Sequence, residues 1–126
     1  MAKYVDGFVL VVPKNKVADY KKMAEEGARV WKKYGALDYK ECMGADLTPK
    51  DMGGMKPRAF TEMANAKKGD TLWFSFIVFK SRKHRDEVNA KVMKEMNKQM
   101  EKYKEVPMPF DMSRFAYGGF DVIVEG

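Results

Sequence analysis

The sequence contains very few of the residues that form covalent cross-links or bind transition metals. Its 126 residues include one cysteine, Cys42, and one histidine, His84. A single cysteine excludes a disulfide within the chain and is typical of a reducing cytoplasm. Because zinc sites are built from several cysteine and histidine ligands, no zinc site is expected from one chain. We therefore expect neither a bound metal nor a tightly bound cofactor.

Long apolar runs and the common nucleotide-binding motifs are also missing. No run approaches the roughly 20 apolar residues that a membrane-spanning helix needs. The sequence has the character of a strand from Tyr4 onward, so we expect no signal peptide, no membrane association and a cytoplasmic location. There is no phosphate-binding loop, no dinucleotide-binding glycine pattern, no nucleophile elbow and no aromatic motif of the RRM type.

Positive charge, in contrast, is in excess. The formal net charge is +6, and the isoelectric point is about 9.3. Such a surplus is compatible with a nucleic-acid partner. The lysines are nevertheless spread over the predicted helices and interleaved with acidic residues, which favours a solvated helix surface. Nucleic-acid binding therefore stays open as an alternative function.

Apolar periodicity predicts four strands and two long helices in a single domain of residues 1–126. The strands are expected at residues 4–12, 37–43, 71–80 and 114–124. The first helix is expected to follow its candidate N-cap Asn15 and to end at Gly35, and the second is expected to follow Ser81 and to stop before Pro107. Residues 44–70 form an irregular excursion, with a short ordered piece expected around residues 58–63. The order β-α-β-β-α-β predicts an α+β, ferredoxin-like fold, in which two helices cover one face of a four-stranded antiparallel sheet.

The third predicted strand is apolar on both faces. Trp73, Ile77 and Phe79 point to one side, and Phe74, Phe76 and Val78 point to the other. Two helices cover only one sheet face, and the other would leave more apolar surface exposed than soluble monomers usually show. We therefore expect a homodimer that pairs through the open sheet faces as a dimeric α/β barrel.

A polar cluster marks the start of the second helix, where Ser81 is the expected N-cap. Its other members are Arg82, His84, Arg85, Asp86 and Asn89. The positive helix end and the neighbouring cations favour a neutral imidazole at His84, which could act as a base. The alternative is an exposed polar residue. The remaining four either bind an anionic ligand or form a structural network.

Two acidic residues lie within otherwise apolar strands. Asp6 and Glu41 each need a polar partner if they are buried, and Arg114 is the predicted partner of Asp6. A carboxylate in an apolar pocket can serve as a base, so both are candidate catalytic residues. The alternative is a structural ion pair.

Several sequence blocks, in order along nearly the whole chain, resemble the YbaA-like family of bacterial proteins. They are residues 4–9, 35–39 with Glu41, 74–78, 81–93, 109–111 with Arg114, and 117–120. The resemblance implies a dimeric α/β barrel without a settled function. In that superfamily, ligands commonly lie between the sheet and the helices of one subunit. The same blocks bring Arg114 and Tyr117 into the set of candidate ligand-binding residues.

Our first hypothesis is a cytoplasmic homodimer that binds a small aromatic or anionic molecule between sheet and helices. Its candidate catalytic residues are Asp6, Glu41 and His84, and its candidate ligand-binding residues are Arg82, Arg85, Asp86, Asn89, Arg114 and Tyr117. Whether it transforms that ligand stays open. The alternatives are a basic RNA- or DNA-binding module, and a structural or regulatory dimer without a ligand.

Overall fold

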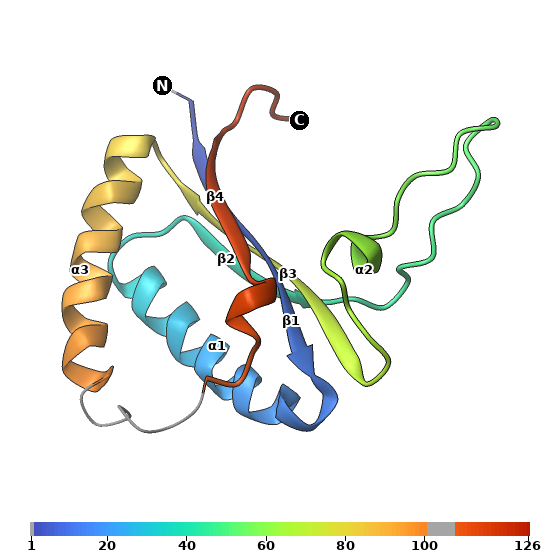
Figure 1. Ribbon diagram of the computed structural model, residues 1–126. Helices are drawn as coiled ribbons and strands as arrows, with labels where there is room; N and C mark the ends of the chain where they lie inside the picture. The colour runs from blue at the N-terminus through green and yellow to red at the C-terminus, as the bar shows by residue number, and fades with distance from the viewer. Residues whose placement is uncertain (1, 101–107) are drawn as a thin grey trace.

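Four antiparallel strands form the sheet, in the order β2-β3-β1-β4. The computed structural model describes residues 2–100 and 108–126 (Figure 1). The strands are β1 (Tyr4–Pro13), β2 (Asp38–Met43), β3 (Asp70–Phe79) and β4 (Ala116–Asp121), and the helices are α1 (Val17–Lys33), α2 (Phe60–Met63) and α3 (Arg82–Met100). Two short 3-10 turns, Lys14–Lys16 and Met112–Arg114, precede α1 and β4. The chain is therefore of the α+β class, as the sequence predicts.

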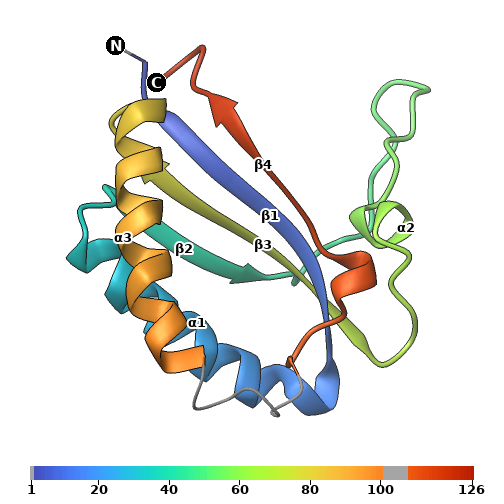
Figure 2. The same ribbon diagram turned by 60° about the vertical axis from the view of Figure 1, so that its left-hand side comes forward.

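The two long helices, α1 and α3, lie on the same face of the sheet (Figures 1 and 2). Alternation along β1 directs Leu10 and Val12 toward this face, and β3 contributes Ile77 and Phe79. Val30 of α1 and Val88 and Val92 of α3 pack with Ile77 and Phe79, whereas Tyr20 of α1 packs with Leu10 and Val12. All of these side chains are buried. Each such side chain stabilises the fold by about 1.5–3 kcal/mol relative to exposure. Most of the hydrophobic core therefore lies on the helix face of the sheet, although Val11 and Leu72 are buried on the opposite side.

The ends of the elements differ in part from the prediction. The Ser81 hydroxyl caps α3, accepting from the His84 backbone N–H at 3.1 Å, as predicted. The N-cap predicted at Asn15 is wrong, because residues 14–16 form a 3-10 turn and α1 begins at Val17. Strand β4 ends at Asp121, so Ile123 lies beyond the sheet and is 85% exposed. The predicted continuation of α3 as far as Pro107 lies outside the described residues.

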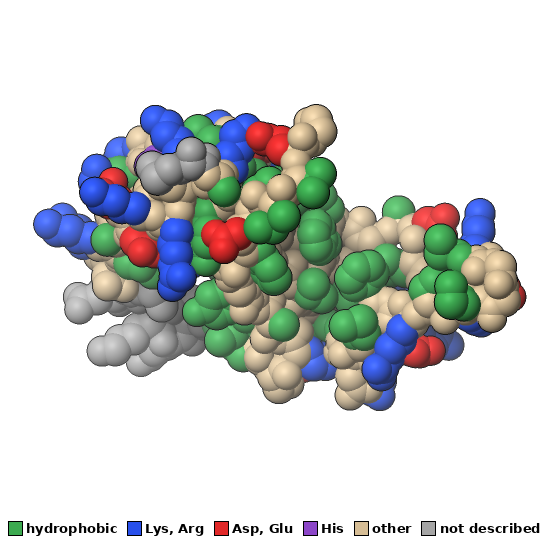
Figure 3. Space-filling view, turned by 90° about the horizontal axis from the view of Figure 1, so that it is seen from above, with side chains coloured by type: hydrophobic (Ala, Val, Ile, Leu, Met, Phe, Trp, Pro, Cys, Tyr) green, Lys and Arg blue, Asp and Glu red, His purple; other side chains and the backbone are tan. Residues whose placement is uncertain are grey.

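The opposite face of the sheet carries no long helix. The segment of residues 44–69, which includes α2, extends from the sheet on the side away from α1 and α3 (Figures 1 and 2). Apolar side chains are exposed on both parts: Phe74 and Phe120 on the sheet, and Met52, Met55 and Met63 on the extended segment. Figure 3 shows hydrophobic side chains gathered over the middle of the molecule and on the protruding segment.

None of the helices in the described part of the chain combines the length and the hydrophobicity that a membrane span requires.

Candidate functional site

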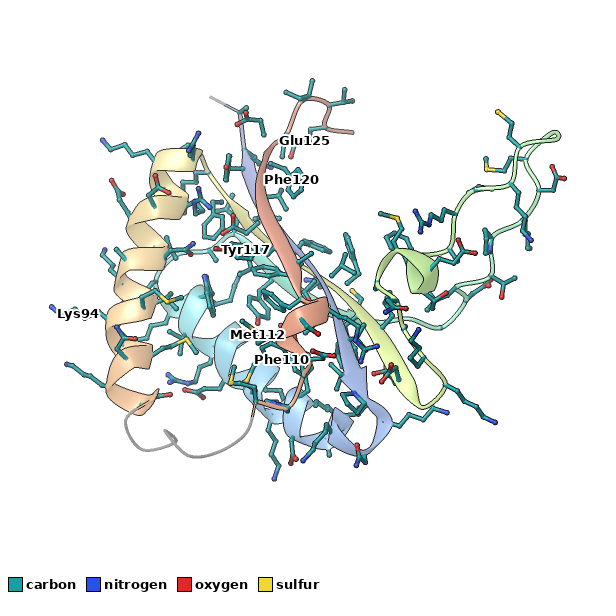
Figure 4. The ribbon with its side chains drawn as sticks, viewed as in Figure 1. Lys94, Phe110, Met112, Tyr117, Phe120 and Glu125 are labelled. Carbon is teal, nitrogen blue, oxygen red and sulfur yellow. The ribbon has the colours of Figure 1, made fainter. Side chains whose placement is uncertain are left out.

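A cavity of about 160 Å³ lies between the sheet and the helices. Most of its wall is apolar, formed by Phe8, Met23, Ile77, Met96, Phe110 and Phe115. Phe110, labelled in Figure 4, comes from the segment before β4 and packs edge-on against Tyr20, with ring centroids 6.0 Å apart. The wall therefore joins residues that are distant in the sequence. An apolar lining of this kind is typical of a site for a small organic molecule.

The polar end of the cavity is the carboxylate of Glu41. Its Oε1 atom accepts hydrogen bonds from the Tyr20 hydroxyl, at 2.8 Å, and from the Ser75 hydroxyl. Its Oε2 atom accepts from the Tyr39 hydroxyl at 2.6 Å. Glu41 and Tyr39 are two residues apart on β2 and share one face, Ser75 lies opposite Glu41 on β3, and Tyr20 comes from α1. Secondary structure thus brings three hydroxyl donors to one carboxylate.

The two tyrosines stay protonated over the physiological range. Burial, followed by the negative charge of Glu41, raises the pKa of Tyr20 and of Tyr39 far above the ordinary value for a phenol. They therefore act as hydrogen-bond donors toward Glu41. Among the described residues, no lysine or arginine forms an ion pair with Glu41. In the described part of the chain, the side-chain donors to this carboxylate are the hydroxyl groups of Tyr20, Tyr39 and Ser75.

A second polar group lies between β1 and α3. Asp6 accepts from Arg85 at 2.8 Å and from the Asn89 amide at 3.2 Å. The Asn89 carbonyl in turn accepts from the Trp31 indole N–H at 2.9 Å. Because Trp31 also lines the cavity, this network fixes one of its walls. The network is an internal brace, and neither Asp6 nor Arg85 lines the cavity.

The prediction that Arg114 pairs with Asp6 is wrong. Arg114 belongs to the 3-10 turn before β4 and bonds Asp70 and Asp111, each at 2.8 Å. In the pairing of β1 with β4, Asp6 lies opposite Gly119, which is five positions after Arg114 in the sequence. Arg114 therefore lies beyond the other end of this strand pair. Arg85, which reaches back from the first turn of α3, takes its place.

The residues of the polar cluster at the start of α3 have separate structural roles. His84 caps α3, since its Nδ1 atom accepts from the Lys80 backbone N–H at 3.0 Å, and its ring packs edge-on against Phe79. Asp86 bonds Arg85, and Arg82 is exposed. Neither His84 nor Arg82 lines the cavity. Tyr117, labelled in Figure 4, is 71% exposed but stacks on the cavity residue Phe8 at a centroid distance of 5.8 Å.

Of the nine candidate catalytic and ligand-binding residues predicted from the sequence, Glu41 alone lines the cavity. The hydroxyl donors Tyr20, Tyr39 and Ser75 were missed as functional residues. A sequence signal pointed to two of the three, Tyr39 and Ser75. Tyr39 shares strand parity with Glu41, and Ser75 is a buried polar residue on the helix-facing side of β3, between Trp73 and Ile77. Among the described residues, no group of three or more histidine, cysteine or acidic side chains is placed to hold a metal ion.

Comparisons with known proteins agree with the resemblance of the sequence blocks. The chain is 37% identical over 123 residues to the uncharacterized protein YbaA of Escherichia coli strain K12, covering 98% of both chains. The YbaA protein of Shigella flexneri matches equally well, at 37% identity and the same coverage. A crystal structure of a Bacillus cereus protein related to NIF3 aligns with all of this chain and 28% of its own, at 12% identity and a TM-score of 0.40. Residues 3–112 match the model of the family described as protein of unknown function DUF1428, and the chain belongs to that family.

Proposed function

We propose that this protein binds a small organic molecule in the cavity between the sheet and helices α1 and α3. The observation that supports the proposal is the position of the Glu41 carboxylate, held by three hydroxyl groups, at one end of an otherwise apolar cavity. Apolar walls with a few convergent polar groups are the usual composition of ligand sites. Of the three candidate catalytic residues, Glu41 is the one that lines this cavity, which supports a role for it in the proposed site.

Of the two kinds of ligand predicted from the sequence, the cavity favours an aromatic molecule over an anionic one. A volume of about 150 Å³ accepts a benzene-sized molecule, and the cavity here measures about 160 Å³. A negative ligand would meet the negative charge of Glu41, while Arg85 is engaged by Asp6 and Asp86. We therefore propose a ligand with a single aromatic or similarly sized apolar group and a hydrogen-bond donor directed at Glu41.

We also propose that the sheet is ferredoxin-like and that two copies pair through their open faces. The strand order β2-β3-β1-β4, with both long helices on one side, supports the first part. The exposed side chains of Phe74 and Phe120 on the uncovered face support the second. A second copy is the proposed occupant, since the apolar face is complementary to itself across a two-fold axis.

A cavity-filling substitution tests the ligand site. Ala24 of α1 lines the cavity and is 8% exposed, whereas Ala18 of the same helix is exposed. The wild type, Ala24→Leu and Ala18→Leu would be screened by thermal shift against single-ring alcohols, phenols, amines and carboxylates. A ligand at 100 times its Kd stabilises a protein by about 2.7 kcal/mol. Compounds that stabilise the wild type are expected to do so in Ala18→Leu and to lose their effect in Ala24→Leu. Equal effects in both variants, or no stabilising compound, would contradict the proposed site.

A further inference from the structure

We infer that the ligand of this cavity is an organic amine, bound in its protonated form with its N–H groups directed at Glu41. This inference rests on the proposed function, because it names the class of ligand that the proposed cavity site takes. Three features of the site support it: an acceptor position on the carboxylate that no described residue fills, a negative charge without a cationic partner among the described residues, and aromatic walls.

The first feature is the hydrogen bonding of Glu41. A carboxylate has about four acceptor positions on its two oxygen atoms. Tyr20 and Ser75 both donate to Oε1, and Tyr39 donates to Oε2. Among the described residues, one position on Oε2 therefore has no donor. Because Glu41 borders the cavity, a ligand N–H is placed to fill that position.

The second feature is the uncompensated charge. In the described part of the chain, each of the other buried or half-buried carboxylates forms an ion pair with lysine or arginine: Asp6, Glu26, Asp38, Asp70, Glu95 and Asp111. Glu41 is the exception. Its neighbour Lys40 also borders the cavity, but its ammonium group bonds Asp38 at 2.5 Å. Partly buried charges are usually paired, and a cationic ligand would supply the missing partner.

The third feature is the aromatic character of the wall. Trp31 and Tyr39 pack with ring centroids 5.9 Å apart, and Phe110 and Phe115 pack at 5.3 Å. All four border the cavity, as does Glu41. Aromatic ring faces attract ammonium groups, most strongly where water is excluded. A carboxylate beside several rings thus provides the two kinds of group that recognise an organic cation, and its own charge disfavours an anion.

Three single-ring probes of nearly equal size test the charge preference. Benzylamine is cationic at pH 7, benzyl alcohol is neutral and benzoate is anionic. Their affinities would be measured by isothermal titration calorimetry for the wild type, for Glu41→Gln, and for Glu25→Gln as an exposed control on α1. We expect the wild type and Glu25→Gln to bind benzylamine at least tenfold more tightly than benzyl alcohol, with no binding of benzoate. In Glu41→Gln the affinities for amine and alcohol are expected to become equal within about threefold.

The outcomes separate the inference from the proposed function. If benzyl alcohol or benzoate binds the wild type as tightly as benzylamine, the cavity is a ligand site but the inference of an amine is wrong. If the amine preference persists in Glu41→Gln, the inference is also wrong, since the preference then has another origin. If none of the three probes binds, and no compound of the wider panel does, the proposed function fails and the inference fails with it. Should Glu41→Gln not fold, the ratio of the probe affinities in the wild type still decides.

Discussion

Removing Arg85 should destabilise the protein strongly, because Arg85 is the partner of a buried acid. The Asp6 side chain is 5% exposed and that of Arg85 is 18% exposed, and their atoms are 2.8 Å apart. In Arg85→Met, Asp6 would keep only the Asn89 amide, 3.2 Å away. Breaking a buried ion pair by removing one partner costs about 3–5 kcal/mol. Since Arg85 retains some exposure, we expect a loss of about 3 kcal/mol, which lowers Tm by roughly 10–15 °C.

Urea denaturation followed by circular dichroism measures this loss, at a fixed protein concentration because dimer formation would make stability depend on concentration. Arg82→Met is the matched control: Arg82 is exposed in the same helix turn, and its loss is expected to cost less than about 0.5 kcal/mol. The double variant with Asp6→Asn removes both charges, so it should be more stable than Arg85→Met alone. If Arg85→Met is no less stable than Arg82→Met, the assignment of Asp6–Arg85 as an internal brace is wrong.

The remaining predictions concern the buried tyrosines, a close backbone contact and the open sheet face. Burial and, to a lesser extent, Glu41 raise the pKa of Tyr20 and of Tyr39. The free energy of unfolding should therefore fall as pH rises above about 10, where phenols ionise in the unfolded chain. A stability that does not change between pH 9 and 11, measured by urea denaturation, would contradict this. Gly119→Ala would place its Cβ atom 2.2 Å from the Tyr4 hydroxyl, so we expect a loss of about 1–3 kcal/mol. At Gly118 the nearest atom is 3.7 Å away, and Gly118→Ala should cost clearly less in the same assay. Phe74→Lys and Phe120→Lys are expected to convert the proposed dimer to a monomer in light-scattering measurements. The control Met93→Lys changes an exposed residue of α3 and should leave the dimer intact. Dissociation by all three variants or by none would contradict pairing through the sheet face.

The strands and helices could be predicted because their sequence patterns are local. The alternation in β3 separates the buried Trp73, Ile77 and Phe79 from the more exposed Phe74, and a serine directly before a helical pattern predicts the cap at Ser81. The exact starts and ends could not be predicted equally well. The 3-10 turn at residues 14–16 moves the start of α1 past Asn15, and nothing in the apolar pattern distinguishes those two geometries.

The glycine pair of β4 illustrates what a local signal can and cannot tell. The sequence predicts either a bulge or a close backbone approach at Gly118 and Gly119. The pairing with β1 runs through both residues without interruption, and Gly119 lies directly against the Tyr4 ring. The close approach is therefore the reason for glycine at position 119. Choosing between the two possibilities requires the ring of Tyr4, which is distant in the sequence.

The partners of the buried acids depend on register and on tertiary packing. Whether Asp6 meets Arg85 or Arg114 depends on how β4 is aligned with β1, a shift of five residues that no local pattern specifies. The site around Glu41 combines α1, β2 and β3, so its three hydroxyl donors become a set only in the folded chain. The sequence did indicate Glu41 itself, because an acid in an apolar strand needs such partners.

The most direct test of the proposed cavity site is methyl NMR of the protein labelled with ¹³C-methyl methionine and titrated with benzylamine. Met23 and Met96 line the cavity, while Met52 and Met55 lie exposed on the protruding segment. Binding in the cavity predicts saturable shifts of the Met23 and Met96 resonances, with those of Met52 and Met55 unchanged. Unchanged Met23 and Met96 resonances, or shifts confined to the exposed methionines, would contradict binding between the sheet and the helices.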